Sequence, residues 1–237
     1  MNTLPGPGSN PVLRNFGFFV ALTTSILTLI TFGIAIMTPP LSGPYCPGDC
    51  FEYPYLDIAS RWPRDYYWMF PAMALTLFYM LLAACVYEFA PAKKKLFGLI
   101  GLAFALLATG TLMIDYFLQV TVIQPSVVRG EGDGISLLTQ YNDHGVFIAL
   151  EEAGYLLMSF SFFSMSAVFS SASHGERFLR WIFSGAFYLV IAVLAIISVI
   201  HGTERSYIFE IAVISINWLA LAVAGFVLSG IFRKTGT

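Results

Sequence analysis

Five acidic residues lie inside long apolar stretches of this sequence: Glu88, Asp115, Glu151, Glu152 and Glu210. A charged side chain at membrane depth costs roughly 2.5–3.5 kcal/mol on insertion scales, so each should be paired, neutralised or turned toward a cavity. Carboxyl groups in such places can carry protons, bind cations or act as general acids and bases. Glu88 is the exception, because it lies close to the run Lys93–Lys95 and can reach the membrane surface.

The spacing of polar residues groups them by helix face. Two pairs are four residues apart and a third pair is seven apart, so each pair shares one face of a helix: Asp115 with Gln119, Glu151 with Tyr155, and Glu210 with Asn217. If these faces converge, they form a polar pocket in the outer half of a membrane. The predicted pocket comprises Asp115, Gln119, Glu151, Glu152, Tyr155, Glu210 and Asn217.

Each side chain has a role in this hypothesis. Burial makes a carboxyl group a plausible proton carrier, so Asp115 and Glu151 are the groups expected to respond to protons or cations. The amide and phenol groups of Gln119, Tyr155 and Asn217 would fix a ligand. The alternative is a purely structural network, because polar residues also join helices in membranes, at about 0.6 kcal/mol per interaction on average.

Three nearby residues have simpler explanations. Adjacent helix residues point about 100° apart, so Glu152 is expected to be the partly exposed member of the pair with Glu151. Asn142 and Asp143 directly precede an apolar stretch and are candidates for capping the start of its helix.

The elements that must position these residues are transmembrane helices. A spanning helix needs about 20 consecutive, mostly apolar residues. Six segments qualify, and together they predict one all-α, six-helix membrane domain over residues 1–237: 16–37, 67–89, 96–123, 145–170, 181–201 and 207–231. Glycine occurs inside these spans, but no span shows the broken helix that marks many transport sites.

The composition supports a membrane protein and excludes other classes. Apolar residues make up 57% of the 237 residues and charged residues only 11%, too few to cover a soluble globule. The net charge is −2 and no basic stripe is present, so nucleic acid is not an expected partner. Membrane lipids and a small lipophilic molecule are the expected partners, and the sequence carries no signal for an oligomeric state.

The basic residues predict an orientation with both termini in the cytoplasm. With the first span starting inside, four basic residues fall in outer loops: Arg61, Arg64, Arg129 and Arg205. The other eight of the 12 fall on the inner side, as the positive-inside rule requires: Arg14, Lys93, Lys94, Lys95, Arg177, Arg180, Arg233 and Lys234.

Cysteine and histidine suggest a disulfide but no metal site. Cys46 and Cys50 flank a Pro-Gly turn in the first outer loop, which faces an oxidising compartment, so we expect a disulfide between them. Cys85 lies inside the second span and is expected to pack there. His144 and His201 belong to no HExxH motif, and no cofactor is predicted.

Two segments around the fourth span resemble other sequences. They are Leu137–Gly145, LLTQYNDHG, and Ile148–Ser159, IALEEAGYLLMS. They resemble parts of uncharacterised prokaryotic multi-pass membrane proteins. The resemblance covers roughly the third and fourth spans. It implies a location in the plasma membrane of a prokaryote and assigns no functional residue.

These observations lead to one functional hypothesis and two alternatives. The first is a small transporter or lipophilic-ligand-binding protein with an outward polar pocket. The second is an intramembrane enzyme that acts on a lipid or isoprenoid, with one carboxyl as general acid and another as base. The third is an assembly or accessory subunit that binds a partner through its outer loops. A lateral opening between spans favours the enzyme, whereas a water path favours transport.

Overall fold

The computed structural model describes residues 11–171 and 173–234, which form eight α-helices and no strand. Six helical stretches are long and apolar enough to cross a membrane, as the hydropathy of the sequence predicts. Five of these are built on α1 (Pro11–Ile36), α2 (Met69–Phe89), α6 (Val146–Ser166), α7 (His174–His201) and α8 (Ile208–Lys234). The remaining one contains α3 (Lys95–Leu118).

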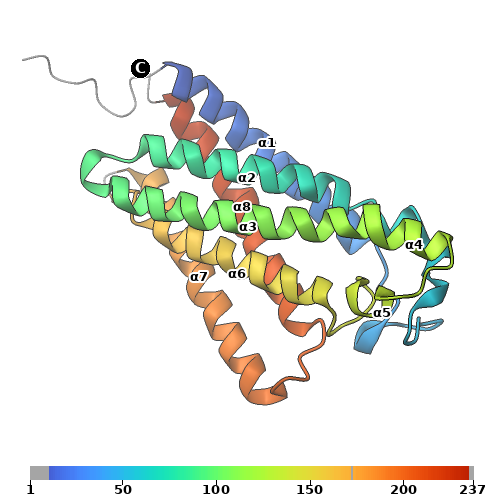
Figure 1. The fold of residues 1–237 in the computed structure, drawn as a ribbon. Coiled ribbons are helices and arrows are strands. Elements are labelled where there is room, and N and C mark those ends of the chain that lie inside the picture. The colour runs from blue at the N-terminus through green and yellow to red at the C-terminus, as the bar shows by residue number, and fades with distance from the viewer. Residues whose placement is uncertain (1–10, 172, 235–237) are drawn as a thin grey trace, which may run out of the picture.

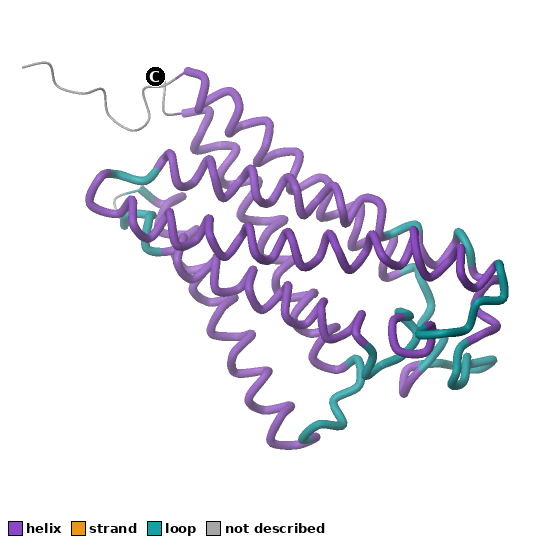
Figure 2. Tube along the Cα trace, viewed as in Figure 1, coloured by secondary structure: helices purple, strands orange, loops and turns teal. Residues whose placement is uncertain are grey.

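The six long helices form one bundle (Figure 1). Helix α2 packs between α1 and α3, and α3 packs against α6. Helix α8 packs against α1, α6 and α7, which closes the bundle. The start of α1 and the end of α8 lie at the same end, where Phe232 packs on Gly17. The two long loops gather at the opposite end, called the loop end below (Figure 2).

Small and hydroxylated residues allow the helices to approach closely. A side chain at Gly225 of α8 would meet the Ala21 carbonyl oxygen of α1 at 2.7 Å. Beside it, the Ser25 hydroxyl donates a hydrogen bond of 2.8 Å to the Ala222 carbonyl. The Ser161 hydroxyl likewise joins α6 to the Gly101 carbonyl of α3 at 2.6 Å. Small residues and interhelical hydrogen bonds of this kind are typical of helix packing within membranes.

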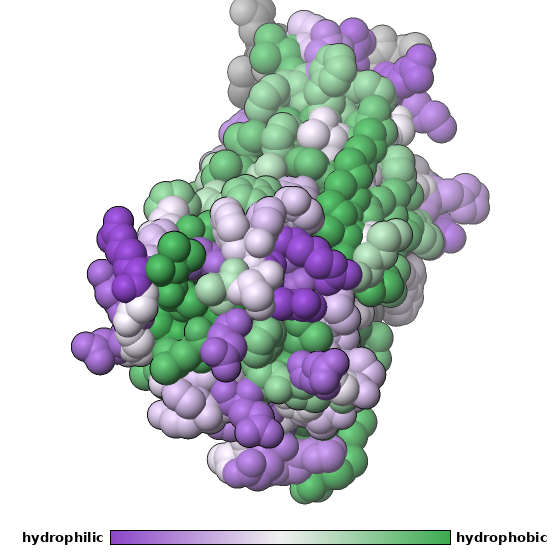
Figure 3. Space-filling model, turned by 90° about the vertical axis from the view of Figure 1, so that its right-hand side faces the viewer, coloured by the Kyte–Doolittle hydropathy of each residue, from purple (hydrophilic) through white to green (hydrophobic). Residues whose placement is uncertain are grey.

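The outer surface of the bundle is apolar along the helices. In the most apolar stretch of 18 residues in α7, only 22% of the residues are buried inside the structure, so most of its apolar side chains face outward. Figure 3 views the molecule onto the loop end, where hydrophilic residues gather, and shows apolar residues covering the helices behind it. An exposed apolar belt next to a polar end is the surface expected of a protein surrounded by lipid.

The third span is longer and less regular than the predicted 96–123. Helix α3 passes into a π-helical turn at Gln119–Ile123 and then into α4 (Gln124–Val128). The helix stays continuous through this turn, because Ala92–Val128 forms one helical stretch of 37 residues. The π-helical turn has wider hydrogen-bonded rings than an α-helix, and such turns inside α-helices occur frequently at functional sites.

The loops contain short helical turns and the predicted disulfide. The first loop carries three 3-10 turns, at Gly43–Tyr45, Leu56–Arg61 and Arg64–Tyr66, and the second carries α5 (Ile135–Leu138). Cys46 and Cys50 form a disulfide, which confirms the pairing expected from their spacing. Cys85 is buried in α2 as a free thiol.

The predicted capping of the fourth span is wrong. The residue that caps α6 is Gly145, and no side chain accepts a hydrogen bond there. Asn142 turns back into the loop, where its Oδ1 accepts from the His144 amide at 3.1 Å. Asp143 interacts instead with Ser206 and with His144. Both side chains therefore stabilise the second loop and its contact with the segment before α8.

Candidate functional site

A cavity of about 350 Å³ lies at the loop end, between α1 and α8 and beneath the first loop. This volume is within the range of small-molecule sites. Its wall contains the last turns of α1, the first turns of α8, the residue before α2, the start of α6 and residues from both loops. The lining residues are Phe32, Ala35, Ile36, Thr38, Pro39, Pro40, Leu41, Ser42, Tyr45, Asp65, Trp68, Gln140, Tyr141, Phe147, Tyr207, Glu210, Ile211, Ile214, Ser215 and Trp218.

The cavity is bordered by apolar helix surface on one side and by polar loop atoms on another. Ile36 and Ile211 line it and are 69% and 49% exposed, so its rim reaches the apolar outer surface between α1 and α8. On the loop side, the Tyr207 hydroxyl donates to the Gln140 carbonyl at 3.3 Å and lies 2.6 Å from the Ser42 hydroxyl. Burial raises the pKa of Tyr207, so this hydroxyl keeps its proton.

Three of the predicted acids form a cluster behind the cavity wall. Glu210 of α8 lines the cavity, and its carboxyl group lies close enough to that of Glu151 on α6 for the two to interact electrostatically. Asp115 of α3 is close enough to interact electrostatically with both. The side chains of Glu151 and Asp115 are almost completely buried, at 0% and 2% exposure. The predicted convergence of three helix faces is therefore present for these acids.

Two phenols complete the cluster, and one of them was not predicted. The Tyr116 hydroxyl donates to Glu151 Oε1 at 2.6 Å and lies 2.9 Å from the Tyr155 hydroxyl. Glu151 Oε2 and Asp115 Oδ2 are buried without a hydrogen-bond donor. The cluster thus has more buried acceptors than protein donors, and a proton on one carboxyl group supplies a missing donor.

Asn217 lies deeper and holds helices together. Its Nδ2 donates to the Tyr155 carbonyl at 3.1 Å and to the Val213 carbonyl at 2.8 Å. Ser159 pairs with the Asn217 side chain at 3.1 Å. These bonds join α6 to α8 and already use the groups that would bind a ligand. The arrangement matches the structural alternative for this residue.

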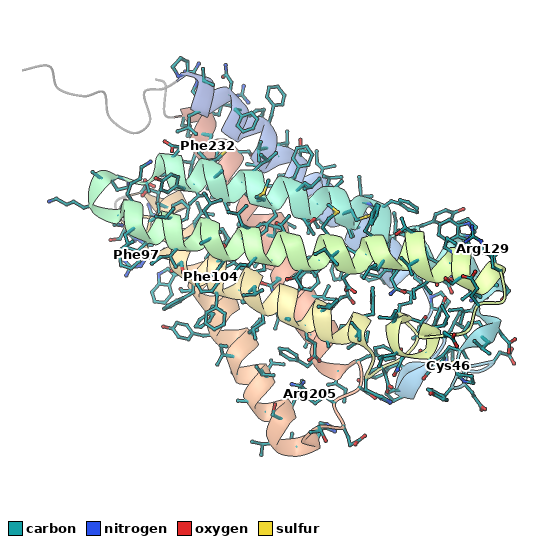
Figure 4. All side chains as sticks on the ribbon, viewed as in Figure 1. Cys46, Phe97, Phe104, Arg129, Arg205 and Phe232 are labelled. Carbon is teal, nitrogen blue, oxygen red and sulfur yellow. A yellow bond between two sulfur atoms is a disulfide. The ribbon has the colours of Figure 1, made fainter. Side chains whose placement is uncertain are left out.

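Gln119 and Glu152 lie outside the cavity wall. Gln119 Nε2 donates to the Leu138 carbonyl at 2.6 Å, and its Oε1 accepts from the Gln140 amide at 3.1 Å, so it attaches the π-helical turn to the second loop. Glu152 forms an ion pair of 3.0 Å with Arg205, and its side chain is 14% exposed. Figure 4 labels Arg205 at the loop end, together with Cys46 and Arg129, far from Phe97 and Phe232.

A second polar cluster was not predicted and forms part of the cavity wall. It consists of Asp65, Arg61, Arg64 and Tyr141 and is called the Asp65 clamp below. Asp65 is 1% exposed, and its carboxylate pairs with Arg61 at 3.0 Å and with Arg64 at 2.8 Å. The Tyr141 hydroxyl donates to Asp65 Oδ2 at 3.0 Å, and Arg64 also donates to the Met37 carbonyl at 3.3 Å. The clamp thus joins the end of α1 to both loops.

The comparisons with known proteins find no relative. No protein-family model, no curated protein and no solved structure matches the chain significantly. The geometry of the cavity and of the carboxyl cluster therefore provides the basis for a functional proposal.

Proposed function

We propose that this chain is a small transporter that binds a lipophilic molecule in the cavity between α1 and α8 and couples its binding to a proton on the carboxyl cluster. The observation that carries the proposal is the position of Glu210, which lines the cavity and adjoins the buried Glu151. A ligand in the cavity can therefore act on a pair of carboxyl groups, of which Glu151 is fully buried.

The presence of a proton on the Glu151–Glu210 pair is inferred from the surroundings of the two carboxyl groups. Two carboxyl groups in contact inside a low-dielectric interior cannot both carry charge, so the pair holds at least one proton between them. The ionisable groups that face it are Asp115 and Tyr116 from α3, and Glu152 and Tyr155 from α6, with Tyr207 preceding α8. Arg205 is the nearest partner of Glu152, and no basic side chain pairs with Glu151 or Glu210 in the described part of the chain.

The cavity suits a molecule that comes from the membrane. Its rim includes Ile36 and Ile211 on the apolar outer surface, and its interior is rich in aromatic side chains. With the orientation given by the basic residues, the loop end faces outward and the cavity opens toward the outer leaflet. A prokaryotic plasma membrane is the location that the sequence resemblance implies.

Filling the cavity tests the proposal. We expect the neutral dye N-phenyl-1-naphthylamine to bind the protein in lipid nanodiscs and to quench the fluorescence of Trp68 and Trp218, which line the cavity. Ser215→Phe fills the cavity and is expected to weaken this binding by about tenfold, the equivalent of about 1.4 kcal/mol. Leu219→Phe adds the same side chain to α8 at an exposed position outside the lining and should change the affinity less than about twofold. Equal quenching in all three proteins would contradict the proposal.

The second candidate is an enzyme acting on a lipid, which the rim between α1 and α8 favours. In that case a lipid chain would lie along Ile36 and Ile211, with its reactive group near Glu210. General acid–base catalysis needs a carboxyl group in contact with the reacting atoms. Glu210 borders the cavity and could make this contact, while Asp65, the other acid in the wall, is held by two arginines. Conversion of a membrane lipid by the purified protein, lost in Glu210→Gln, would favour the enzyme over transport.

A further inference from the structure

The charged side chains that line the cavity are both acidic. Its wall contains two acidic side chains, Asp65 and Glu210, and no lysine or arginine among the described lining residues. Arg61 and Arg64 compensate the charge of Asp65. Within residues 11–171 and 173–234, no basic side chain forms an ion pair with Glu210. An acid without a basic partner in a mostly apolar wall attracts a positive charge and repels a negative one.

The rest of the wall is aromatic and apolar. Trp68, Phe147 and Trp218 are buried, with exposures of 9%, 2% and 1%, and Tyr141 and Tyr207 lie on the loop side. The faces of aromatic rings attract organic cations, and cages of such rings are the usual means of binding quaternary ammonium groups. The same rings and the isoleucines of the rim provide apolar surface for the body of a molecule.

These features together select a class of ligand. We propose that the cavity binds a lipophilic organic cation, an amine or quaternary ammonium group attached to an apolar body, with its charge beside Glu210. This inference rests on the proposed function and specifies its ligand. A lipophilic anion would meet Glu210 without a compensating base, and a neutral molecule would leave the carboxyl cluster without a partner for its charge.

A metal ion fits the cluster less well than an organic cation does. The described residues contain no group of three histidine, cysteine, aspartate or glutamate side chains placed to hold a metal ion. Glu151 Oε1 is already engaged by Tyr116. Glu210 is the member of the cluster that borders open volume, and that volume is large enough for an organic molecule.

A pair of probes of similar size and opposite charge tests the inference. Tetraphenylphosphonium is a cation and tetraphenylborate is an anion, and each can displace N-phenyl-1-naphthylamine from the protein in nanodiscs. Partition into the lipid is subtracted with Ser215→Phe, in which the cavity is filled. We expect the cation to bind at least about tenfold more tightly than the anion. Glu210→Gln should reduce this preference to within about threefold, whereas Glu210→Asp, which keeps the charge, should retain most of it.

The matched control removes an acid of the same type from the loop just before α8. Glu204 is exposed and does not line the cavity, so Glu204→Gln should keep the wild-type preference. Equal binding of the two probes to the wild-type protein, or an unchanged preference in Glu210→Gln, would overturn the inference. The proposed function would then still stand if Ser215→Phe weakens the binding of the neutral dye. If the neutral dye binds equally well to Ser215→Phe, the proposed function fails on its own.

Discussion

Glu151→Gln is expected to reduce the pH dependence of the protein's stability to less than half of the wild-type dependence, whereas the neighbouring change Glu152→Gln is not. The proposed function places one proton between Glu151 and Glu210 in the folded state, and the stabilisation from this proton is lost as the pH rises. Because the folded state binds more protons than the unfolded state, the free energy of unfolding falls with rising pH. The slope is at most about 1.4 kcal/mol per pH unit for one proton.

The physical reason is that glutamine supplies the missing donor permanently. Its amide can donate to Glu210, and it still accepts from Tyr116, so no proton has to be shared. Thermal unfolding in nanodiscs at about pH 6 and about pH 9 measures the effect. We expect the wild-type protein to melt at a clearly lower temperature at the higher pH and Glu151→Gln to show less than half of that difference.

Glu152→Gln is the control, because it removes one acid from the same turn of α6. Glu152 pairs with Arg205 near the surface, and partly exposed pairs of this kind contribute about 0–1 kcal/mol. The variant should therefore keep most of the wild-type dependence on pH. The account would be contradicted if the two variants behaved alike.

Asp65→Asn is expected to destabilise the protein by about 2–3 kcal/mol. The substitution keeps the shape of the side chain but removes the charge that holds Arg61 and Arg64. Charge-assisted hydrogen bonds contribute about 1.5–3 kcal/mol, and the Tyr141 hydroxyl also loses an ionised acceptor. Arg61 and Arg64 are partly exposed, so water can solvate them after the change and limits the loss.

The clamp also shapes the cavity, so the same variant should weaken ligand binding. Asp65 and Tyr141 both line the cavity, and the clamp fixes the end of α1 at Met37. Thermal unfolding and the quenching of tryptophan by N-phenyl-1-naphthylamine measure the two effects. Asp57→Asn is the control, because Asp57 is exposed in the same loop and surface changes usually alter stability by less than about 0.5 kcal/mol. Wild-type stability of Asp65→Asn would show that the clamp does not hold the loops.

The sequence predicts the six long helices because hydropathy over about 20 residues is a strong local signal. It also predicts the convergence of Asp115, Glu151 and Glu210. Helical spacing shows which polar residues share a helix face, and an acid inside a membrane span is expected to face the interior of the bundle. The disulfide follows from the closeness of Cys46 and Cys50 in the chain. Each of these features follows from a local pattern in the sequence or from the free-energy cost of placing a charged group inside the membrane.

The features that were missed depend on contacts between distant segments. Tyr116 is next to Asp115 in the chain, but tyrosine is common in membrane helices and its bond to Glu151 depends on how α3 meets α6. The Asp65 clamp requires the folded second loop, although the spacing of four between Arg61 and Asp65 is a signal that could have drawn attention to it. Asn217 has the spacing of a ligand-binding residue, yet Tyr155 and Val213 use its amide.

The π-helical turn is a further feature that hydropathy does not reveal. Gln119 starts this turn, and its amide bonds to residues of the second loop stabilise the altered backbone. A hydropathy window averages over such a turn, because the apolar character of Val120, Val122 and Ile123 continues through it. The length of the third span was underestimated for the same reason.

The most direct test of the account is infrared spectroscopy of the carboxyl groups in the wild-type protein. A protonated carboxyl group absorbs at a different frequency from a carboxylate, so the spectrum at neutral pH reports whether Glu151 and Glu210 share a proton. We expect a protonated-carboxyl band that Glu210→Gln removes and that Glu152→Gln leaves in place. We also expect a bound ligand to change the intensity of this band. Absence of the band, or its full persistence in Glu210→Gln, would contradict a shared proton at the cavity.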